Sequence, residues 1–481
     1  MQHRRRDIQR YRTEPEQEQR QHENASLHKP GKLTIVISQW AGRLMGAVGD
    51  RSFHTQGEQY EANMTKRDFL WNGIGTGCWG VVFPILTMIV TQLTGAEDAG
   101  MFSLAFVAAS LLMILANFGV RTFQVSDLDE EHSFADYQAN RLMTCLAMML
   151  VGWLYCVIHG YGATMFTMCM GLFFYKMIDG FADVYEGRLQ QMGKLYLGGI
   201  SMTLRSVVAF IFFTVALLIT GSLPIASWLM GISALATMIL VTMPLAYLET
   251  PKSRTMTLSG VASLFKQAWP MFAALFMYAL VDNMPKFVME GQLSYDNQLY
   301  FNALYFPAQY ILLTAQLVYK PMLVNLAETW QDPAKRKRFN LIILAVCGII
   351  VVITAVMALV MHFVGLWVMG ILYGIDFEQF HTLCLIMLAA GGMTAGIDFI
   401  YQTTVILRRQ MDCMVGYVIS FVLSLFVPLL LIHYAQLAGA VIGYLIVMVV
   451  LFMLMIWIYL RILLEKPARV PQRDRNVPPQ F

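Results

Sequence analysis

The segment NLIILAVCGIIVVITAVMALVMHFV, residues 340–364, contains no Asp, Glu, Lys or Arg, and the basic run 335–338 stands just before it. A helix needs about 20 apolar residues to cross the roughly 30 Å hydrocarbon core of a bilayer, and this segment is long enough. Basic residues that flank a span settle at the membrane surface. The segment is therefore predicted to be a membrane-spanning helix that begins at a basic surface.

The rest of the chain repeats this pattern. It has 481 residues, of which 57% are hydrophobic and only 14% are charged, whereas soluble domains carry about 25% charged residues. We therefore predict an all-α polytopic membrane protein with about twelve transmembrane helices. The apolar runs lie at 69–94, 99–121, 141–160, 163–187, 196–221, 224–248, 268–291, 298–327, 340–364, 380–407, 412–433 and 436–463.

The distribution of Lys and Arg predicts the orientation of these helices. The segments between runs form two alternating sets, and one set contains no Lys or Arg: TGAEDAG, HGYGA, GSLP, GQLSYDN, WVMGILYGIDFEQF and HYAQ. The other set holds Arg188, Lys194, Arg408 and the run 335–338, among others. Because short cytoplasmic loops are enriched in Lys and Arg, we expect both termini on the cytoplasmic side.

A weak internal repeat relates the two halves of the chain. AGMFSLAF at 99–106 resembles QLYFNALYF at 298–306, and a shift of 199 residues aligns Phe102 with Phe301. Six helices in each half, with the same orientation, would form a parallel repeat about an axis along the membrane normal. We therefore predict two six-helix bundles, residues 65–250 and 251–465, that enclose a central cavity.

Polar tails flank the two bundles. Residues 1–64 begin with an Arg-, Gln- and Glu-rich stretch that is too poor in apolar residues to form a core, so they are expected to be largely disordered. Within them, residues 32–51 place apolar side chains on one helical stripe, which predicts either an interfacial helix or a weakly helical tail. Residues 466–481 form a second cytoplasmic tail, and no apolar signal-peptide core is present at the start.

Motifs for catalysis and metal binding are missing from the sequence. The seven cysteines form neither a CxxC motif nor a Cys/His cluster, so no metal site or disulfide framework is indicated. No Walker A, GxSxG or HExxH motif occurs. We therefore expect no catalytic residue, cofactor or metal, and no nucleic-acid partner. The protein is predicted not to be an enzyme.

Charges at membrane depth are the candidate functional residues, because each one costs about 2.5–3.5 kcal/mol on insertion scales. In the first half, Arg205 lies near the middle of the fifth run, and Asp179 and Asp183 lie on the fourth. An antiparallel fifth helix could bring Arg205 next to Asp179. Arg121 lies at the cytoplasmic end of the second run, where the repeat aligns it with Lys320 of the eighth.

In the second half, Asp282, Lys286 and Glu290 follow one another at i, i+4 spacing on the seventh run, beside Pro285. Read alone, this spacing predicts a ladder of ion pairs. The outward direction of the run separates its members, with Glu290 in outer water, Asp282 near mid-depth and Lys286 between them. Asp398 lies in the inner part of the tenth run.

Each charge has a structural alternative to a binding role. Arg121 and Lys320 could extend to the inner headgroups, and Asp179 and Asp183 could reach cytoplasmic water. Arg205 and the Asp282–Lys286 pair could be structural ion pairs. The functional interpretation is a water-filled cavity whose cations hold a phosphate or pyrophosphate through charge-assisted hydrogen bonds.

Several stretches, in this order along 66–465, resemble one family. They are AGMFSLAF with NFGVRTFQVSD, KMIDGFADVYEGRLQQMGK with SMTLRS, DNMPKFVMEG with YFNALYFPAQYILL, and ILYGIDF with VILRRQ. The chain resembles the polysaccharide-transporter family of the MATE-related multidrug/oligosaccharidyl-lipid/polysaccharide (MOP) flippase superfamily, which includes the Wzx-type O-antigen flippases. The resemblance implies two six-helix bundles arranged as a V.

The resemblance also implies a function. Such a protein moves an undecaprenyl-pyrophosphate-linked oligosaccharide across the inner (cytoplasmic) membrane by alternating access, for surface polysaccharides such as lipopolysaccharide O-antigen. Membrane lipids and other polysaccharide assembly proteins would be its partners. The residues that would bind the sugar-pyrophosphate are Arg205, Lys286, Lys320 and Arg121. Those that would couple ions or pair with these cations are Asp282, Asp179, Asp183 and Asp398.

One departure from the superfamily bears on energy coupling. Related multidrug antiporters have an acidic residue deep in the first span, whereas residues 69–93 contain none. Two other functions remain open. One is a multidrug/cation antiporter of the same superfamily, and the other is a membrane-embedded glycan polymerase, which the Lys- and Arg-free outer loops disfavour.

Overall fold

The computed structural model describes residues 57–127, 130–323, 326, 329–330, 335–407 and 409–464. Within these ranges the chain consists of helices joined by short loops and contains no β-strand. The predicted interfacial helix at 32–51 and the C-terminal tail lie outside the described residues. The first described helix, α3, begins at Gly57, which lies within the predicted tail 1–64.

The first half of the chain forms a bundle of long helices joined by short turns. Ser133 starts one of them, α6, through a capping box in which its hydroxyl accepts from the Asp136 amide and the Asp136 carboxylate accepts from the Ser133 amide. The helices are α3 (Gly57–Thr94), α4 (Ala96–Asn117), α5 (Val120–Ser126), α6 (Phe134–Ile158), α7 (Ala163–Gln191), α8 (Leu195–Thr220), α9 (Leu223–Thr237), η1 (Met238–Thr242) and α10 (Met243–Glu249).

The second half forms a bundle of the same kind. Here α11 begins well before the predicted run 268–291. The helices are α11 (Leu258–Met289), α12 (Tyr295–Tyr319), η2 (Lys320–Met322), α14 (Arg336–Val360), η4 (Met361–Gly365), α15 (Leu366–Tyr373), η5 (Glu378–Phe380), α16 (His381–Ile406), η6 (Gln410–Asp412) and α17 (Cys413–Leu464).

Helix α17 is a hairpin of two helices. Gln436 interrupts it with φ 49° and ψ −127°, a conformation outside the helical region. A Cβ added at Gly439 would lie 2.0 Å from the Leu431 carbonyl oxygen, and one at Gly443 would lie 3.0 Å from Pro428. Residues farther from Gln436 on one arm contact residues farther from it on the other arm, so the two arms run antiparallel. The arms match the predicted runs 412–433 and 436–463.

Nine helices of the described chain are long and apolar enough to cross a membrane, with α17 counted once. The predicted runs 163–187 and 298–327 also form helices, α7 and α12, although polar and charged residues make them less hydrophobic. The described residues of each of the twelve predicted runs therefore lie mainly on helices. The chain is a multi-pass membrane protein, as predicted.

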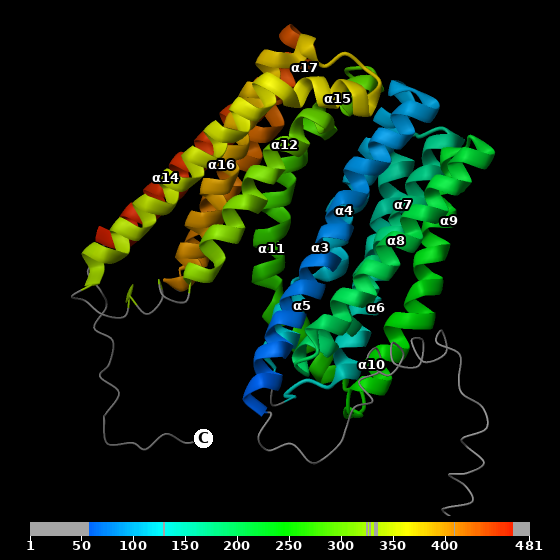
Figure 1. Ribbon diagram of the computed structural model, residues 1–481, viewed down its shortest axis with the longest axis vertical. Helices are drawn as coiled ribbons and strands as arrows, with labels where there is room; N and C mark the ends of the chain where they lie inside the picture. Colours follow the sequence, from blue (N-terminus) through cyan, green and yellow to red (C-terminus); the bar gives the residue numbers. More distant parts are fainter. Residues whose placement is uncertain are drawn as a thin grey trace, which may run out of the picture.

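The two bundles form a V (Figure 1). They lie close together at the end that carries α15 and diverge toward the end where α14 begins, next to the basic run 335–338. We call the end with the basic loops the inner end and the opposite one the outer end, after the predicted orientation. Between the bundles α4 packs on α12, and these are the two helices that the internal repeat relates.

Helix α11 contacts both bundles. Its inner half places Leu264, Ala268 and Phe272 in one apolar cluster with residues of α6, α7 and α8. Phe272 stacks on Phe118 of the first bundle with ring centroids 4.4 Å apart. Farther along, Tyr278 contacts Tyr417 of α17 in the second bundle. The boundary between the bundles therefore runs through α11.

Candidate functional site

A network of buried ion pairs lies inside the first bundle. Arg205 on α8 donates from Nε to Asp179 at 2.9 Å and from Nη1 to Glu186 at 2.6 Å. Both carboxylates are on α7, and all three side chains are at most 2% exposed. The contact between Arg205 and Asp179, which the antiparallel arrangement of the fourth and fifth helices predicted, is present.

The carboxylate of Asp179 has two further partners. Trp79 on α3 donates its indole N–H to Asp179 Oδ2 at 2.9 Å. Lys176, one turn earlier on α7, lies 3.4 Å from the same oxygen and 4.5 Å from the centre of the Trp79 ring. A buried ammonium gains from both a carboxylate and an aromatic face. The first helix thus contributes an aromatic donor to this network.

Toward the inner end, Asp183 pairs with two arginines. Arg141 on α6 donates to Asp183 Oδ2 at 2.8 Å and also bonds the Asn117 side-chain oxygen at 2.8 Å. Arg121 on α5 binds the other oxygen of Asp183 and donates to Gln190 at 3.0 Å. The predicted site residues Arg121 and Asp183 are therefore in direct contact.

The charged residues of α7 lie on one stripe of the helix, which explains why they form one network. Isolated charges in a low-dielectric interior cost several kcal/mol each, and only close pairing with good geometry repays this. Cations outnumber carboxylates in this network, so a group of opposite charge would balance it. Its cations are Lys176, Arg205, Arg121 and Arg141, and its carboxylates are Asp179, Asp183 and Glu186.

The predicted ladder on α11 is wrong. Among the described residues Lys286 makes no ion pair with Asp282 or Glu290. Its Nζ bonds the Asn283 side-chain oxygen at 2.9 Å and lies 3.8 Å from the centre of the Tyr305 ring. The prediction failed because i, i+4 spacing brings side chains together only when no third group offers a better contact.

Asp282 is held by hydroxyl groups. Tyr305 on α12 donates to one carboxylate oxygen, and Tyr444 on α17 donates to the other at 2.7 Å. Tyr444 in turn lies 3.4 Å from the Thr394 hydroxyl of α16. No Lys or Arg of the described chain lies within ion-pair distance of Asp282. Four helices of the second bundle therefore meet around one buried carboxylate.

The last two predicted residues lie nearer the inner end of the second bundle. Asp398 on α16 accepts hydrogen bonds from the Tyr319 hydroxyl and, at 3.1 Å, from the Gln316 amide. Lys320 is exposed and bonds the Gln316 oxygen at 2.8 Å. Gln316 thus connects the two. Asp398 and Asp179 occupy the fourth long helix of their respective bundles.

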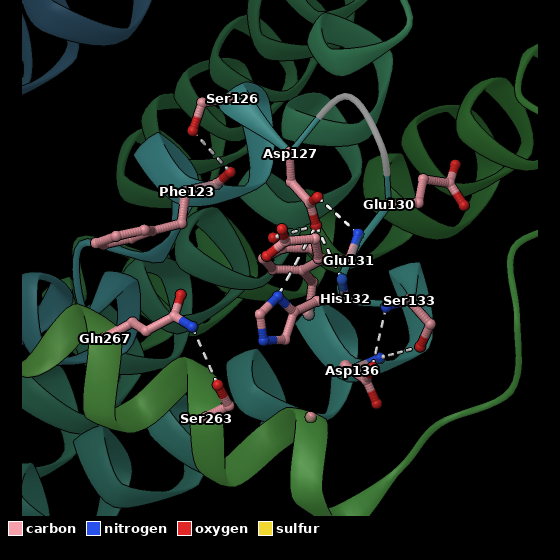
Figure 2. Close-up of polar contacts among 12 residues, drawn as sticks. Phe123, Ser126, Asp127, Glu130, Glu131, His132, Ser133, Asp136, Ser263 and Gln267 are labelled. Carbon is pink, nitrogen blue, oxygen red and sulfur yellow. Dashed lines mark hydrogen bonds and ion pairs between the residues drawn. The ribbon is translucent and has the colours of Figure 1, made fainter. Parts of the chain in front are cut away.

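Polar contacts link the segment after α5 to the start of α6 (Figure 2). Asp127 accepts from the backbone amides of Glu131 at 2.8 Å and His132 at 3.0 Å, and from the Tyr137 hydroxyl at 3.0 Å. Gln267 of α11 lies beside this loop, and together they line a pocket of about 210 Å³. Here α11 borders the first bundle directly.

The linker between the bundles is fixed to this loop. Glu130 forms an ion pair of 2.6 Å with Arg188 and accepts a hydrogen bond of 3.3 Å from Ser253. Asp136 accepts from the Thr257 amide at 2.6 Å, just before α11 begins. The linker is therefore held against the first bundle.

Several residues of the two networks were not among the predicted site residues. Lys176 lies within the stretch KMIDGFADVYEGR that the prediction used, three residues before Asp179, so its spacing was a usable signal. Arg141 is the first residue of the predicted run 141–160 and was not singled out there. Tyr305 and Tyr444 carry no charge, and only the packing of α11, α12 and α17 brings them to Asp282.

Known structures share this architecture. An inward-facing multidrug resistance MATE transporter aligns with a TM-score of 0.57 and 13% identity, over 79% of this chain and 94% of its own. The MATE transporter VcmN of Vibrio cholerae, in its bent form, aligns with a TM-score of 0.55 and 13% identity, over 84% and 97%. The chain has the fold of a MATE transporter.

A third MATE-like structure is a MOP superfamily transporter from Pyrococcus furiosus, described as having a binding pocket of reversed polarity. It aligns with a TM-score of 0.54 and 14% identity, over 83% of this chain and 95% of its own. No protein-family model and no curated protein matches the sequence. At these identities the likeness shows a shared fold.

Proposed function

We propose that this MATE-like transporter moves a lipid-linked oligosaccharide, joined to its polyprenol through pyrophosphate, across the cytoplasmic membrane. The observation that supports this cargo is the network of the first bundle, in which four cations face three carboxylates. Arg205, Arg141 and Lys176 are each at most 2% exposed, and cations at such depth persist mainly where they serve transport or binding. Other proteins of surface polysaccharide assembly would supply and remove the cargo.

The ion pairs suggest how an anion would be bound. In the present conformation Asp179 and Glu186 occupy the donors of Arg205. A pyrophosphate carries more negative charge than one carboxylate and accepts bidentate hydrogen bonds from guanidinium. When the bundles move apart, the pyrophosphate takes over part of this pairing. Arg121, which is 28% exposed, is the first cation that cargo from the inner end meets.

The test is a flipping assay with purified protein in liposomes. A fluorescent polyprenyl-pyrophosphate oligosaccharide is placed in one leaflet, and its appearance in the other is followed by a membrane-impermeant quencher. The wild type should flip it, and Arg205→Ala together with Lys176→Ala should reduce the rate at least tenfold. Glu97→Ala, a change at the start of α4 outside the networks, serves as the matched control. Wild-type protein that leaves the lipid in place disproves this cargo.

A multidrug/cation antiporter is the second candidate, and a specific observation favours it. Asp282 and Asp398 are held only by hydroxyl and amide donors in the described chain. A carboxylate without a paired cation is suited to bind a proton or a metal cation. Uptake of a cationic dye into the same liposomes, driven by a proton or sodium gradient and abolished by Asp282→Asn, would establish this function.

A further inference from the structure

One carboxylate connects the two bundles at the outer end. Glu290 follows the last residue of α11 and is only 8% exposed. Its Oε2 accepts a hydrogen bond of 3.0 Å from the Tyr155 hydroxyl of α6, and the Tyr161 hydroxyl donates to Oε1. Both tyrosines belong to the first bundle. The prediction that Glu290 is solvated at the outer surface is therefore wrong.

The position of Glu290 is unfavourable without these partners. The C-terminus of a helix carries a partial negative charge, which repels an anion by a few tenths of a kcal/mol or more. Burial adds a desolvation cost. Two hydroxyl donors from the opposite bundle offset both effects, and the His159 ring nitrogen lies 3.9 Å away. The hydroxyl oxygens of Tyr161 and Tyr155 lie 3.0 Å apart, so the two donors sit side by side on the carboxylate.

Two further contacts join the bundles at the same end. Gln92 of α3 donates to the carbonyl of Leu372 in α15 at 2.6 Å. At the start of α4 and of α12, Gly100 approaches Tyr295 so closely that an added Cβ would lie 1.8 Å from its carbonyl oxygen. The outer end is thus closed by direct contact, while the bundles diverge toward the inner end (Figure 1).

We propose that Glu290, Tyr155 and Tyr161 form an outer gate, which holds the transporter in the conformation closed on the outer side. Opening to that side requires both hydroxyls to leave the carboxylate, and Glu290 then meets outer water. The proposal rests on alternating access between the bundles and is independent of the cargo. The gate therefore sets the balance between the two conformations.

The gate is tested by a distance measurement that needs no substrate. Spin labels are introduced as genetically encoded amino acids at Ile219, at the outer end of α8, and at Tyr434, in the bend of α17. These side chains are 78% and 77% exposed, and encoded labels avoid the native cysteines. In lipid nanodiscs, Glu290→Ala should raise the ratio of long to short label distances about tenfold, as expected for loss of a hydrogen bond to a charged group.

Two matched controls separate the gate from general disturbance of the outer end. Tyr373→Phe removes a buried tyrosine hydroxyl that has no hydrogen-bond partner in the described chain, and Glu378→Ala removes an exposed outer carboxylate. Neither should change the distances. Tyr155→Phe combined with Tyr161→Phe should reproduce the effect of Glu290→Ala. If the Glu290→Ala protein does not fold, the double tyrosine variant serves as the test of the gate.

Unchanged distances in the double tyrosine variant would overturn the gate. That outcome would leave the proposed cargo untouched, because the measurement contains no lipid-linked sugar. Conversely, if the variants show the expected shift in distances but the wild type does not flip the oligosaccharide, the gate is supported and the proposed cargo is wrong.

Discussion

The ring of Tyr305 lies between two charges of α11, with its face 3.8 Å from Lys286 Nζ and its hydroxyl on the Asp282 carboxylate. One side chain of α12 thus takes the place of a direct ion pair between two residues of a single helix. A cation on the aromatic face and an anion at the hydroxyl both suit the charge distribution of a phenol. The arrangement leaves Lys286 without a carboxylate to neutralise it.

Lys286→Met should separate transport from stability. Methionine keeps the length of the side chain and removes a charge that is 2% exposed. The lost contact with the aromatic ring is worth about 2 kcal/mol, and removing the desolvation cost offsets it. We expect a Tm at or above that of the wild type in detergent, with flipping reduced at least tenfold. Normal flipping by this variant would mean that Lys286 does not take part in binding the cargo.

Arg205→Met should destabilise the protein by about 3–5 kcal/mol, because it leaves buried carboxylates unpaired. Asp179 keeps Lys176 at 3.4 Å, so Glu186 is the residue left without a cation. Adding Glu186→Gln should therefore restore a large part of the loss. Chemical unfolding of the two single variants and the double variant gives the coupling energy. Strictly additive effects would contradict the direct pairing.

Gly100→Ala should disturb the outer end, because its methyl group would meet the Tyr295 carbonyl at 1.8 Å. The backbone oxygen cannot turn aside as a flexible side chain would, so α4 and α12 must separate. We expect a lower Tm and a shift of the outer label distances toward longer values. Gly77→Ala on α3, where nothing lies within 4 Å of the added carbon, should be neutral or slightly stabilising.

Gln436→Gly should stabilise the α17 hairpin by about 1 kcal/mol. Gln436 has φ 49° and ψ −127°, a conformation that is strained for residues with a Cβ and accessible to glycine. Gln436→Ala keeps the Cβ and should bring no gain. Thermal unfolding of both variants tests this, and equal effects would mean that the bend carries no backbone strain.

Most of the fold could be predicted from the sequence, because hydrocarbon thickness fixes the length of a membrane helix and loops mark its ends. Apolar runs with few charged residues, such as 340–364, predicted helices clearly. The prediction was weaker where a helix continues into polar sequence. The α11 start at Leu258 is an example, since LSGVASLFKQ, residues 258–267, is not apolar enough to read as a span.

The candidate site was only partly predictable. The antiparallel arrangement of the fourth and fifth helices predicted that Arg205 lies near Asp179, and the structure has the two residues paired. The partners of Asp282 come from helices far apart in sequence, Tyr305 on α12 and Tyr444 on α17. No local pattern encodes such a meeting, because it depends on how whole helices pack.

The division of α11 between the bundles has a consequence for biosynthesis. When α11 leaves the ribosome, the first bundle has already been made, and it offers the apolar surface around Phe118 that receives Phe272. The inner half of α11 can therefore dock before α12 to α17 exist. The second bundle would then be assembled onto a helix that is already in place, so that the first half of the chain acts as a template for the orientation of the second.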